Sequence, residues 1–277
     1  MRVSVIFTTY NSPEWLEKVL WGFFYQTYKD FEIVIADDGS SGETRALIEA
    51  MRMQTGMSIR HEWQEDEGFR KGRILNKAIL AAENEYIVFT DGDCIPRRDF
   101  VEVHVRESAI GCFLSGSYYK LPMSTSKKIT KEDIASGRCF DVSWLRENGL
   151  PWGRKTLKLR ARGKWAKLLN KLTPTQCNLK GSNASAWKSD ILAVNGYDER
   201  MAWGGQDREF GIRLINSGVK PKHVRYDAIV VHLDHSRGYK DPEMVASNKK
   251  LRLKNEREGV TTTDYGISRL DRKQPPI

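Results

Sequence analysis

Two aspartates on either side of a glycine, Asp91-Gly92-Asp93, are the clearest candidates for chemistry in this sequence of 277 residues. They follow the apolar run from Tyr86 to Thr90, which predicts a buried strand. Two carboxylates at positions i and i+2 that leave a strand together can both approach one hard divalent cation, and the glycine leaves room for a phosphate. The motif therefore predicts a metal site, although such a triplet alone is often only a turn.

A second acidic pair, Asp37-Asp38, follows another apolar run, from Phe31 to Ala36. In doubly wound sheets, ligands bind beyond the carboxyl ends of the strands. Acidic residues that directly follow two predicted strands therefore favour a ligand at that edge of the sheet. The alternative is that Asp37 and Asp38 only cap the turn that follows them.

The elements that must position these groups alternate between strands and helices in the first third of the chain. Apolar residues and their spacing predict strands at 3–7, 31–36, 58–63 and 86–90, with helices at 13–24, 43–54 and 71–82. This order predicts an α/β fold with a mostly parallel, doubly wound sheet. In the second half we expect strands at 113–119 and 229–232, helices at 185–193 and 207–217, and a polar tail at 259–277 that frays.

Composition is that of a soluble globular protein, with 40% hydrophobic and 29% charged residues. No apolar run approaches the ~20 residues of a membrane helix, and a strand-like run begins at Val3 where a secretory signal would stand. The four cysteines include no C-x-x-C pair, which argues against a zinc ribbon or a redox motif. These features predict reduced thiols and a cytoplasmic location.

The net charge of +9 is concentrated in one segment. Residues 148–189 contain no acid and ten basic residues, so the rest of the chain is nearly neutral. The basic positions are 154, 155, 158, 160, 162, 164, 167, 171, 180 and 188. A protein that binds nucleic acid over its whole surface would spread this charge, so we expect no nucleic-acid partner.

The motifs together resemble those of a known family. The array Val3-Ser4-Val5-Ile6-x-Thr8-x-Tyr10-Asn11, Asp37-Asp38-Gly39-Ser40 and Asp91-Gly92-Asp93 resembles the nucleotide-binding half of family 2 glycosyltransferases with the GT-A fold, over about residues 3–105. A second set is similar to β-1,4-galactosyltransferases and chondroitin-polymerase-like enzymes. It comprises Lys180-Gly181-Ser182-Asn183-Ala184-Ser185, Asn195-Gly196-Tyr197-Asp198-Glu199, Trp203-Gly204-Gly205-Gln206-Asp207-x-Glu209 and His235-Ser236-Arg237.

The resemblance implies an inverting, metal-dependent glycosyltransferase. Such an enzyme moves a hexose or N-acetylhexosamine from a UDP-sugar to a hydroxyl of a glycan or lipid-linked glycan, in bacterial surface polysaccharide or lipopolysaccharide assembly. A carboxylate takes the proton of that hydroxyl, and Mn²⁺ or Mg²⁺ neutralises the departing diphosphate. The resemblance also implies a nucleotide-sugar-binding half at 1–110 and an acceptor-binding, catalytic half at 111–258, within one continuous catalytic domain.

Roles carry over onto individual positions of this sequence. The resemblance implies nucleotide-sugar contacts at Thr8, Tyr10, Asp38, Arg70, Arg73, Asp91 and Gly92, with Arg73 near the nucleobase and Arg70 as its alternative. It implies a catalytic base at Asp207 and metal ligands at Asp93, His235 and His232. Acceptor or sugar contacts are implied at Asn183, Trp203, Gly204, Gly205 and Gln206. Galactosyltransferases carry glutamate where this chain has Gln206, which weakens any inference about the acceptor sugar.

Structural interpretations of the same residues stay open at this point. His232 lies on the apolar run 229–231 and could be a packed, hydrogen-bonded histidine, and the same alternative applies to His235. Trp203 could belong to the core, and Asn183 could be a turn residue. Cys94 is expected to serve packing alone, because a thiol has no role in this chemistry.

Two other functions are alternatives to glycosyl transfer. A sugar-nucleotide nucleotidyltransferase needs a glycine-rich, basic loop after its first strand, but residues 8–13 contain neither glycine nor lysine. A basic nucleic-acid-binding protein is the other alternative, and the confinement of the charge argues against it.

The stretch from 151 to 174 adds a hypothesis of its own. It contains eight basic residues and no acid, and its apolar residues Trp165, Leu168, Leu169 and Leu172 fall on one face of a short helix. Basic helices of this kind bind anionic membrane surfaces, so we expect peripheral attachment to the inner face of a membrane. A mobile lid over the donor phosphates and plain packing on the domain are the alternatives.

Overall fold

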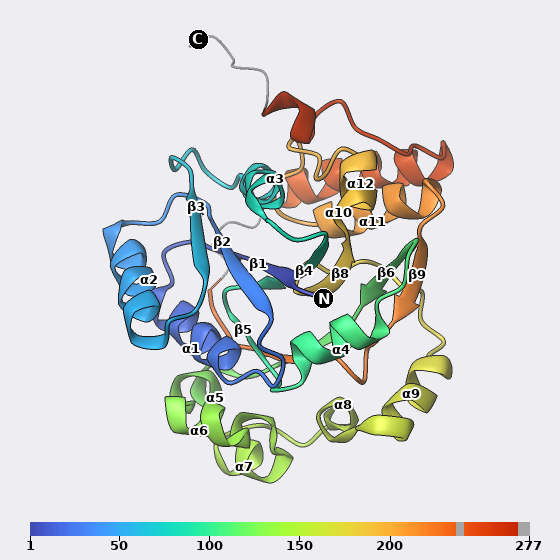
Figure 1. Cartoon of the computed structure of the whole chain (residues 1–277). Helices are drawn as coiled ribbons and strands as arrows, with labels where there is room; N and C mark the ends of the chain where they lie inside the picture. Colours follow the sequence, from blue (N-terminus) through green and yellow to red (C-terminus); the bar gives the residue numbers. More distant parts are fainter. Residues whose placement is uncertain (237–240, 271–277) are drawn as a thin grey trace.

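The computed structural model describes residues 1–236 and 241–270, and its centre is a seven-stranded sheet (Figure 1). The strands lie in the order β3-β2-β1-β4-β8-β6-β9. Strands β1 to β4 are mutually parallel, and β8 is antiparallel to both β4 and β6. Their bounds are β1 Val3–Thr9, β2 Phe31–Asp37, β3 Ile59–Trp63, β4 Tyr86–Asp91, β6 Cys112–Ser115, β8 Asn183–Trp187 and β9 Lys220–His223. The predicted α/β fold with a mostly parallel sheet is confirmed.

Side chains that alternate along the strands build a hydrophobic core on each face of the sheet. Val3, Val5 and Phe7 of β1 face one core, and Ile6 faces the other. The first core is covered by α1 (Pro13–Phe24), α2 (Gly42–Thr55) and α4 (Phe100–Glu107). The second is covered by α3 (Lys71–Ala81), α10 (Lys188–Ala193) and α11 (Gln206–Asn216), and α12 (Pro242–Arg257) packs on α11 (Figure 1).

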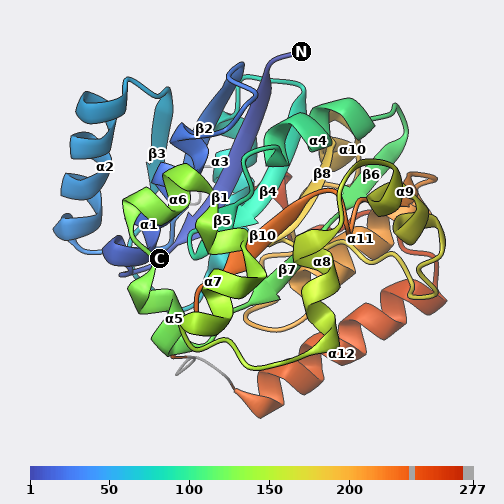
Figure 2. The same ribbon diagram turned by 90° about the horizontal axis from the view of Figure 1, so that it is seen from below.

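A smaller sheet of three strands lies beside the first. Its order is β5 (Cys94–Pro96), β10 (Ile229–His232) and β7 (Ser117–Lys120), and His232 pairs with both Cys94 and Lys120. Short helices of the chain from 123 to 171 surround this sheet (Figure 2). They are α5 Met123–Lys128, α6 Lys131–Ser136, α7 Val142–Glu147, α8 Leu157–Arg160 and α9 Gly163–Lys171, with 3-10 turns at Arg138–Phe140, Arg154–Thr156 and Ile267–Arg269.

Two predicted elements in the second half were wrong. The single strand expected at 113–119 is two strands in different sheets, because the chain breaks at Gly116, where a side chain would collide with the amide of Asn183. The helix expected at 185–193 begins only at Lys188, because the residues before it form β8 between β4 and β6. The small residues of β8 carry no strand signal of their own, and pairing on both sides decides their conformation.

The expectation that the tail frays was wrong for residues 259–270. Ile267 is 5% exposed and joins the second core. The hydroxyl of Thr263 donates a hydrogen bond to Asp198, and the Asn195 amide donates one to the carbonyl of Thr263. One apolar side chain and these polar contacts are enough to hold the segment in place. Residues 271–277 lie outside the described part of the chain.

All four cysteines are free thiols, as expected. Among the described helices, none combines the length and apolar character needed to cross a membrane.

Candidate active site

The carboxyl ends of β1, β2 and β4 meet at one edge of the sheet, as the sequence predicts. Strand register places Thr8 beside Asp91, and the Thr8 hydroxyl donates a hydrogen bond to that carboxylate at 3.3 Å. The backbone N–H of Gly92 donates to the carbonyl oxygen of Thr8 at 2.8 Å. A Cβ atom at position 92 would lie 2.7 Å from that oxygen, so β1 and the Asp91-Gly92-Asp93 turn can approach this closely only with glycine there.

The two aspartates that end β2 have different surroundings. Asp37 caps the turn, because its carboxylate accepts a hydrogen bond from the backbone N–H of Ser40 at 2.8 Å. The Asp38 carboxylate accepts from the Gln64 amide at 2.6 Å and from the backbone N–H of Arg70 at 2.9 Å. Burial raises the pKa of Asp38, although these hydrogen bonds oppose the shift. Turn capping therefore accounts for Asp37, whereas Asp38 fixes the start of α3 against β2.

The remaining residues predicted to hold the nucleotide separate into two groups. Tyr10 is half-exposed beside Asp38, and its hydroxyl donates a hydrogen bond to Asp66 at 2.8 Å. The guanidinium of Arg73 donates to Glu199 at 3.0 Å. The structure thus brings Tyr10 and the Arg70 backbone to Asp38, and it ties Arg73 to the second half of the chain.

Asp93 and two histidines form the predicted cluster of metal-binding groups. The Asp93 carboxylate lies 3.0 Å from Nε2 of His235 and 3.6 Å from Nε2 of His232, and the two imidazole rings stack with centroids 5.5 Å apart. Burial would raise the pKa of Asp93, but the hydrogen bond with His235 and the charges of both histidines outweigh it and lower that pKa. The strand pairing of His232 with Cys94 is what carries this imidazole to Asp93.

The cluster fits a divalent cation. Carboxylate oxygen and imidazole nitrogen together are a donor set that suits Mn²⁺. Nε2 of His232 is the ring nitrogen that faces Asp93, whereas its Nδ1 atom is buried with no hydrogen-bond partner among the described residues. The Cys94 thiol also lies in this cluster. Burial and the charge of Asp93 raise its pKa well above the usual range, so it stays a neutral thiol and a poor ligand.

Asp207 sits in the first turn of α11, on a loop that only glycines can form. Gly204 and Gly205 have φ angles of 106° and 95°, in the left-handed region, and they lead directly into the helix. Asp207 packs against Gly181, where an added Cβ would lie 2.8 Å from the Asp207 carboxyl carbon. Its Oδ1 atom is buried without a hydrogen-bond partner among the described residues, so this carboxylate oxygen keeps an unused acceptor position.

Lys71 joins the two acidic groups, and sequence reasoning missed it. Its ammonium donates a hydrogen bond to Asp91 at 2.6 Å. Burial would lower the pKa of Lys71, but the charges of Asp91, Asp207 and Asp93 raise it above its ordinary value. A lysine at the positive end of a helix with no acidic residue in its first turn is unfavourable without such partners. This unfavourable position of Lys71, between Arg70 and Arg73, can be read from the sequence.

The surroundings of Asp207 predict a pH dependence. Burial raises the pKa of Asp207, Lys71 opposes the shift, and Asp91 adds to it. A base acts only as the carboxylate, so its rate should fall as pH drops through this raised pKa, at a higher pH than for an ordinary aspartate. Replacing Lys71 with methionine should move this acidic limb to still higher pH, which a kcat profile against pH would measure. An unchanged limb in the variant would contradict the assignment.

Two other carboxylates near Asp207 are bound to partners of their own. Glu209 is fully buried and receives two hydrogen bonds from Arg213, at 2.7 and 2.8 Å. Asp198 is held by Arg200 and Thr263. Neither group has an oxygen free for a substrate proton, which leaves Asp207 as the candidate base.

The predicted acceptor contacts are only partly brought to the site. The Asn248 amide on α12 donates to the backbone carbonyls of residues 202–204 and so holds the loop that carries Trp203. Gln206 is buried, and its side-chain oxygen accepts from the backbone N–H of Gly204 at 3.0 Å, so it shapes this loop.

The expected sugar contact of Asn183 is not supported. Its side chain is fully buried and donates to the carbonyls of Ser117 and Ala228, while its oxygen faces His104 at 3.1 Å. These bonds join β8 of the large sheet to β7 of the small sheet and to the residue just before β10. Arg237, part of the same motif set in the sequence, lies outside the described residues.

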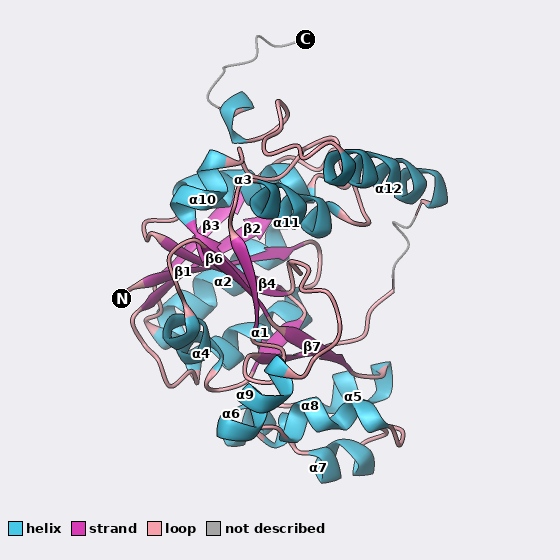
Figure 3. Ribbon diagram, turned by 90° about the vertical axis from the view of Figure 1, so that its right-hand side faces the viewer, coloured by secondary structure: helices cyan, strands magenta, loops and turns pink. Residues whose placement is uncertain are grey.

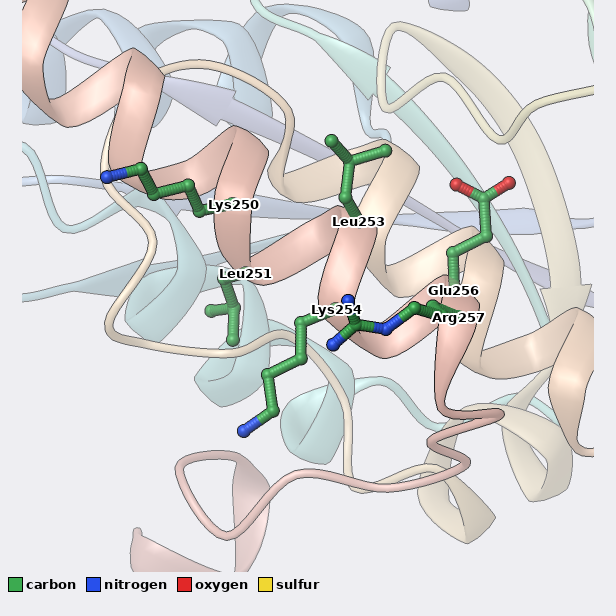
Figure 4. A pocket seen from close by; sticks show the side chains of 6 residues that line it. All are labelled: Lys250, Leu251, Leu253, Lys254, Glu256 and Arg257. Carbon is green, nitrogen blue, oxygen red and sulfur yellow. The ribbon is translucent and has the colours of Figure 1, made fainter.

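A surface hollow of about 720 Å³ lies along α12 (Figure 4). It is lined by Lys250, Leu251, Leu253, Lys254, Glu256 and Arg257 and includes none of the site residues. An open hollow on one helix offers no convergent polar groups, so we assign it no chemistry.

Comparisons with known proteins agree with this geometry. Residues 4–112 match the family model "Glycosyl transferase family 2", and residues 175–236 match "N-terminal domain of galactosyltransferase". The first range contains Asp38, Asp91 and Asp93, and the second contains Asp207 with both histidines.

Curated relatives span much of the chain at low identity. A chain described as uncharacterized glycosyltransferase YfnE of Bacillus subtilis is 25% identical over 90% of this chain and 69% of its own length. Validoxylamine A glucosyltransferase of Streptomyces hygroscopicus is 25% identical over 85% of this chain and 56% of its own. Chondroitin synthase of Escherichia coli is 24% identical over 78% of this chain and 32% of its own, so the chain spans only part of several relatives.

Solved structures share the fold. Mannosyltransferase PcManGT from Pyrobaculum calidifontis, in complex with GDP-Man and Mn²⁺, matches with a TM-score of 0.58 and 19% identity, over 86% of this chain and 58% of that one. S. aureus TarS 1–349 in complex with UDP-GlcNAc matches with a TM-score of 0.59 and 15% identity, over 94% of this chain and 69% of that one. At these identities the likeness establishes the fold, which is the GT-A fold.

Proposed function

We propose that this chain, which has the GT-A fold and matches family 2 glycosyltransferases over residues 4–112, is a glycosyltransferase domain that carries out an inverting transfer of a hexose or N-acetylhexosamine. The donor is a UDP-sugar, the cofactor is Mn²⁺ or Mg²⁺, and the acceptor is a glycan hydroxyl in bacterial surface polysaccharide or lipopolysaccharide assembly. The observation that carries the proposal is Lys71, whose ammonium binds Asp91 at 2.6 Å and whose pKa the charge of Asp207 also raises, because it links the predicted donor and acceptor halves in one site. The names of similar proteins, which include a glucosyltransferase and a chondroitin synthase, support the class of reaction.

The chain's own residues account for the transfer step. The free oxygen of Asp207 takes the proton of the acceptor hydroxyl as that oxygen attacks the anomeric carbon of the donor. The new C–O bond forms as the bond from the anomeric carbon to the phosphate oxygen breaks, and the nucleoside diphosphate leaves with the electron pair. Attack from the side opposite the leaving group inverts the anomeric centre.

The donor lies along the carboxyl ends of β1, β2 and β4 in this proposal. Asp38 and Thr8 hold the uracil and ribose, Asp91 faces the ribose, and the diphosphate lies beyond the turn at Gly92. Asp93, His232 and His235 would hold the cation, which supplies positive charge to the departing diphosphate when bound. Lys71 keeps Asp91 in place and restrains the rise in the pKa of Asp207.

Turnover of nucleotide sugars tests the proposal. The protein is incubated with a panel of UDP-sugars and with GDP-mannose, with Mn²⁺ or with a chelator, and the released nucleotide is measured. We expect metal-dependent release of UDP from at least one UDP-sugar. Release of GDP alone would indicate a GDP-sugar donor instead of a UDP-sugar. Formation of a sugar nucleotide from a nucleoside triphosphate would favour a nucleotidyltransferase.

The basic segment 151–174 supports a second part of the proposal, peripheral attachment to the inner face of a membrane. Helix α9 buries only Ala166, whereas Trp165 is 71% exposed, Leu168 44% and Leu172 67%. The structure therefore does not bury this apolar face by packing it on the domain. Exposed tryptophan and leucine beside lysines are the composition of a helix that lies in a membrane interface. A lipid-linked acceptor would be presented at such a surface.

Flotation with liposomes tests this attachment. We expect the protein to float with anionic vesicles and to be released by salt, because about 1 kcal/mol per basic residue near the surface supports reversible binding. Replacing Trp165 and Leu168 with glutamate should abolish flotation, while the same change at exposed Met53 on α2 should not. Equal, salt-insensitive recovery in the soluble fraction with anionic and neutral vesicles would contradict the attachment.

A further inference from the structure

Three cations from the basic half of the chain lie together at the same sheet edge as Asp91. We call Lys158, Lys180 and Arg225 the inner cations. Lys158 donates a hydrogen bond to the Ser117 hydroxyl at 2.7 Å, and Arg225 donates to the Thr175 hydroxyl at 2.7 Å. Burial lowers the pKa of Lys158 to about 8, and the positive charges of Arg225, Lys180 and Lys155 add to this shift.

The inner cations lack acidic partners. In the described part of the chain, no carboxylate lies within 4.0 Å of any of the three, whereas the more exposed Lys167 and Lys222 both pair with Glu107. The Nε atom of Arg225 is buried with no hydrogen-bond partner among the described residues. Three half-buried cations that repel one another and keep an unused donor are arranged for an anion that arrives from outside.

Strand directions place this cluster on the acceptor side of the site. Strands β6 and β9 run in the same direction as β4, because β8 between them is antiparallel to both β4 and β6. The carboxyl ends of β6 and β9 carry the loop at 173–182, through hydrogen bonds from Ser115 to Asn178 and between His223 and Thr175. With strands about 4.8 Å apart, β9 lies roughly 14 Å from β4, beyond the donor side of the sheet.

One of the inner cations, Lys180, is linked to the candidate base through the backbone. Lys180 precedes Gly181, and Asp207 packs against Gly181. The metal-type cluster lies at the other end of β10, since Ser117 pairs with Ile229 while Lys120 pairs with His232. A donor diphosphate held near Asp93 and His232 is therefore separated from Lys158 by the length of this strand.

We propose that Lys158, Lys180 and Arg225 form a subsite for an anionic group of the acceptor, a phosphate or a carboxylate, next to the hydroxyl that Asp207 deprotonates. The inference rests on the proposed function and narrows its acceptor to an anionic glycan. Charge-assisted hydrogen bonds to such a group would relieve the repulsion among the three cations. The exposed lysines of α9 are a separate set, available to the membrane surface.

Calorimetry with simple sugars tests the subsite. Glucose 6-phosphate, glucuronate and glucose are titrated into the full chain, with and without saturating UDP and Mn²⁺. We expect both anionic sugars to bind at least about 10-fold more tightly than glucose, whether or not UDP is present, as charge-assisted pairing predicts. The double variant Lys158→Gln/Lys180→Gln should lose this preference, and each single variant should lose part of it.

The matched control removes two lysines elsewhere. Lys249 and Lys250 are exposed on α12 (Lys250 in Figure 4), and Lys249→Gln/Lys250→Gln changes the net charge equally, so it should keep the preference. Unchanged affinity for UDP and Mn²⁺ would verify that the double variant folds. Three results would overturn the subsite. They are equal affinities for the three sugars, an equal loss of the anionic preference in the control variant, and displacement of the anionic sugars by UDP. If the wild-type protein does not bind UDP, that result would instead count against the proposed function.

Discussion

Replacing Asp207 with asparagine should lower the rate of glycosyl transfer by roughly 10²–10⁴-fold, the usual contribution of a positioned base. Asparagine keeps the shape and the hydrogen-bonding capacity of the side chain but cannot accept a proton at neutral pH. Affinity for UDP and metal should change little, because the donor lies on the other side of Lys71. Steady-state rates and UDP calorimetry on the same variant would separate chemistry from binding.

Stability provides a control that a merely misfolded variant would fail. The folded-state pKa of Asp207 is raised, so its contribution to stability is present below the unfolded pKa and is lost as pH rises through the folded value. At neutral pH the ionised carboxylate therefore destabilises the protein, and Asp207→Asn should have a higher Tm than the wild type. The difference should shrink as pH falls. Near-normal turnover in this variant would contradict the base assignment, since Glu209 and Asp198 are already bound to arginines.

Replacing Asp93 with alanine should abolish metal-dependent binding of UDP. Loss of a residue that only hydrogen-bonds to a metal ligand typically lowers metal affinity about 10- to 100-fold. Removal of a ligand itself should therefore lower it by roughly 100-fold or more. Calorimetry with UDP in the presence of Mn²⁺ measures this directly. The side chain is only partly buried at a strand exit, so the fold should survive.

Asp99 provides the matched control for Asp93. It is also a partly exposed aspartate near β5, and its carboxylate pairs with Arg97 instead of the histidines. Asp99→Ala should therefore leave the effect of Mn²⁺ on UDP binding intact. Undiminished metal-dependent binding in Asp93→Ala would remove Asp93 from the metal site.

The sequence predicted the donor side of the molecule well because its signals are local. Apolar runs end in Asp38 and Asp91, and parallel pairing brings such strand exits to one edge whatever the rest of the chain does. The helices of this half begin and end within about a residue of the prediction, since the apolar spacing that marks each helix lies within its own segment.

The second half was harder to predict because long-range pairing decides its structure. Residues 183–187 form a strand only because β4 and β6 lie on either side, and Gly116 divides a run that looks like one strand. Asn183 was expected to contact a sugar, but contacts with two sheets bury it. No local pattern records such neighbours.

Lys71 was missed for a related reason. Its partners Asp91 and Asp207 are 20 and 136 positions away in sequence, and only the fold brings them together. The basic segment was likewise treated as one feature, whereas the structure separates the exposed lysines of α9 from half-buried Lys158 and Lys180. Figure 3 shows α8 and α9 on the side of the molecule opposite α12.

The most direct test of the account is a crystal structure of the protein with UDP and Mn²⁺, with anomalous diffraction recorded at the manganese absorption edge. The account predicts one strong anomalous peak in direct contact with the Asp93 carboxylate and a histidine nitrogen, with the uracil beside Asp38 and the Asp207 carboxylate free of metal. A peak elsewhere with none at Asp93, or UDP bound away from the carboxyl ends of β1, β2 and β4, would contradict it.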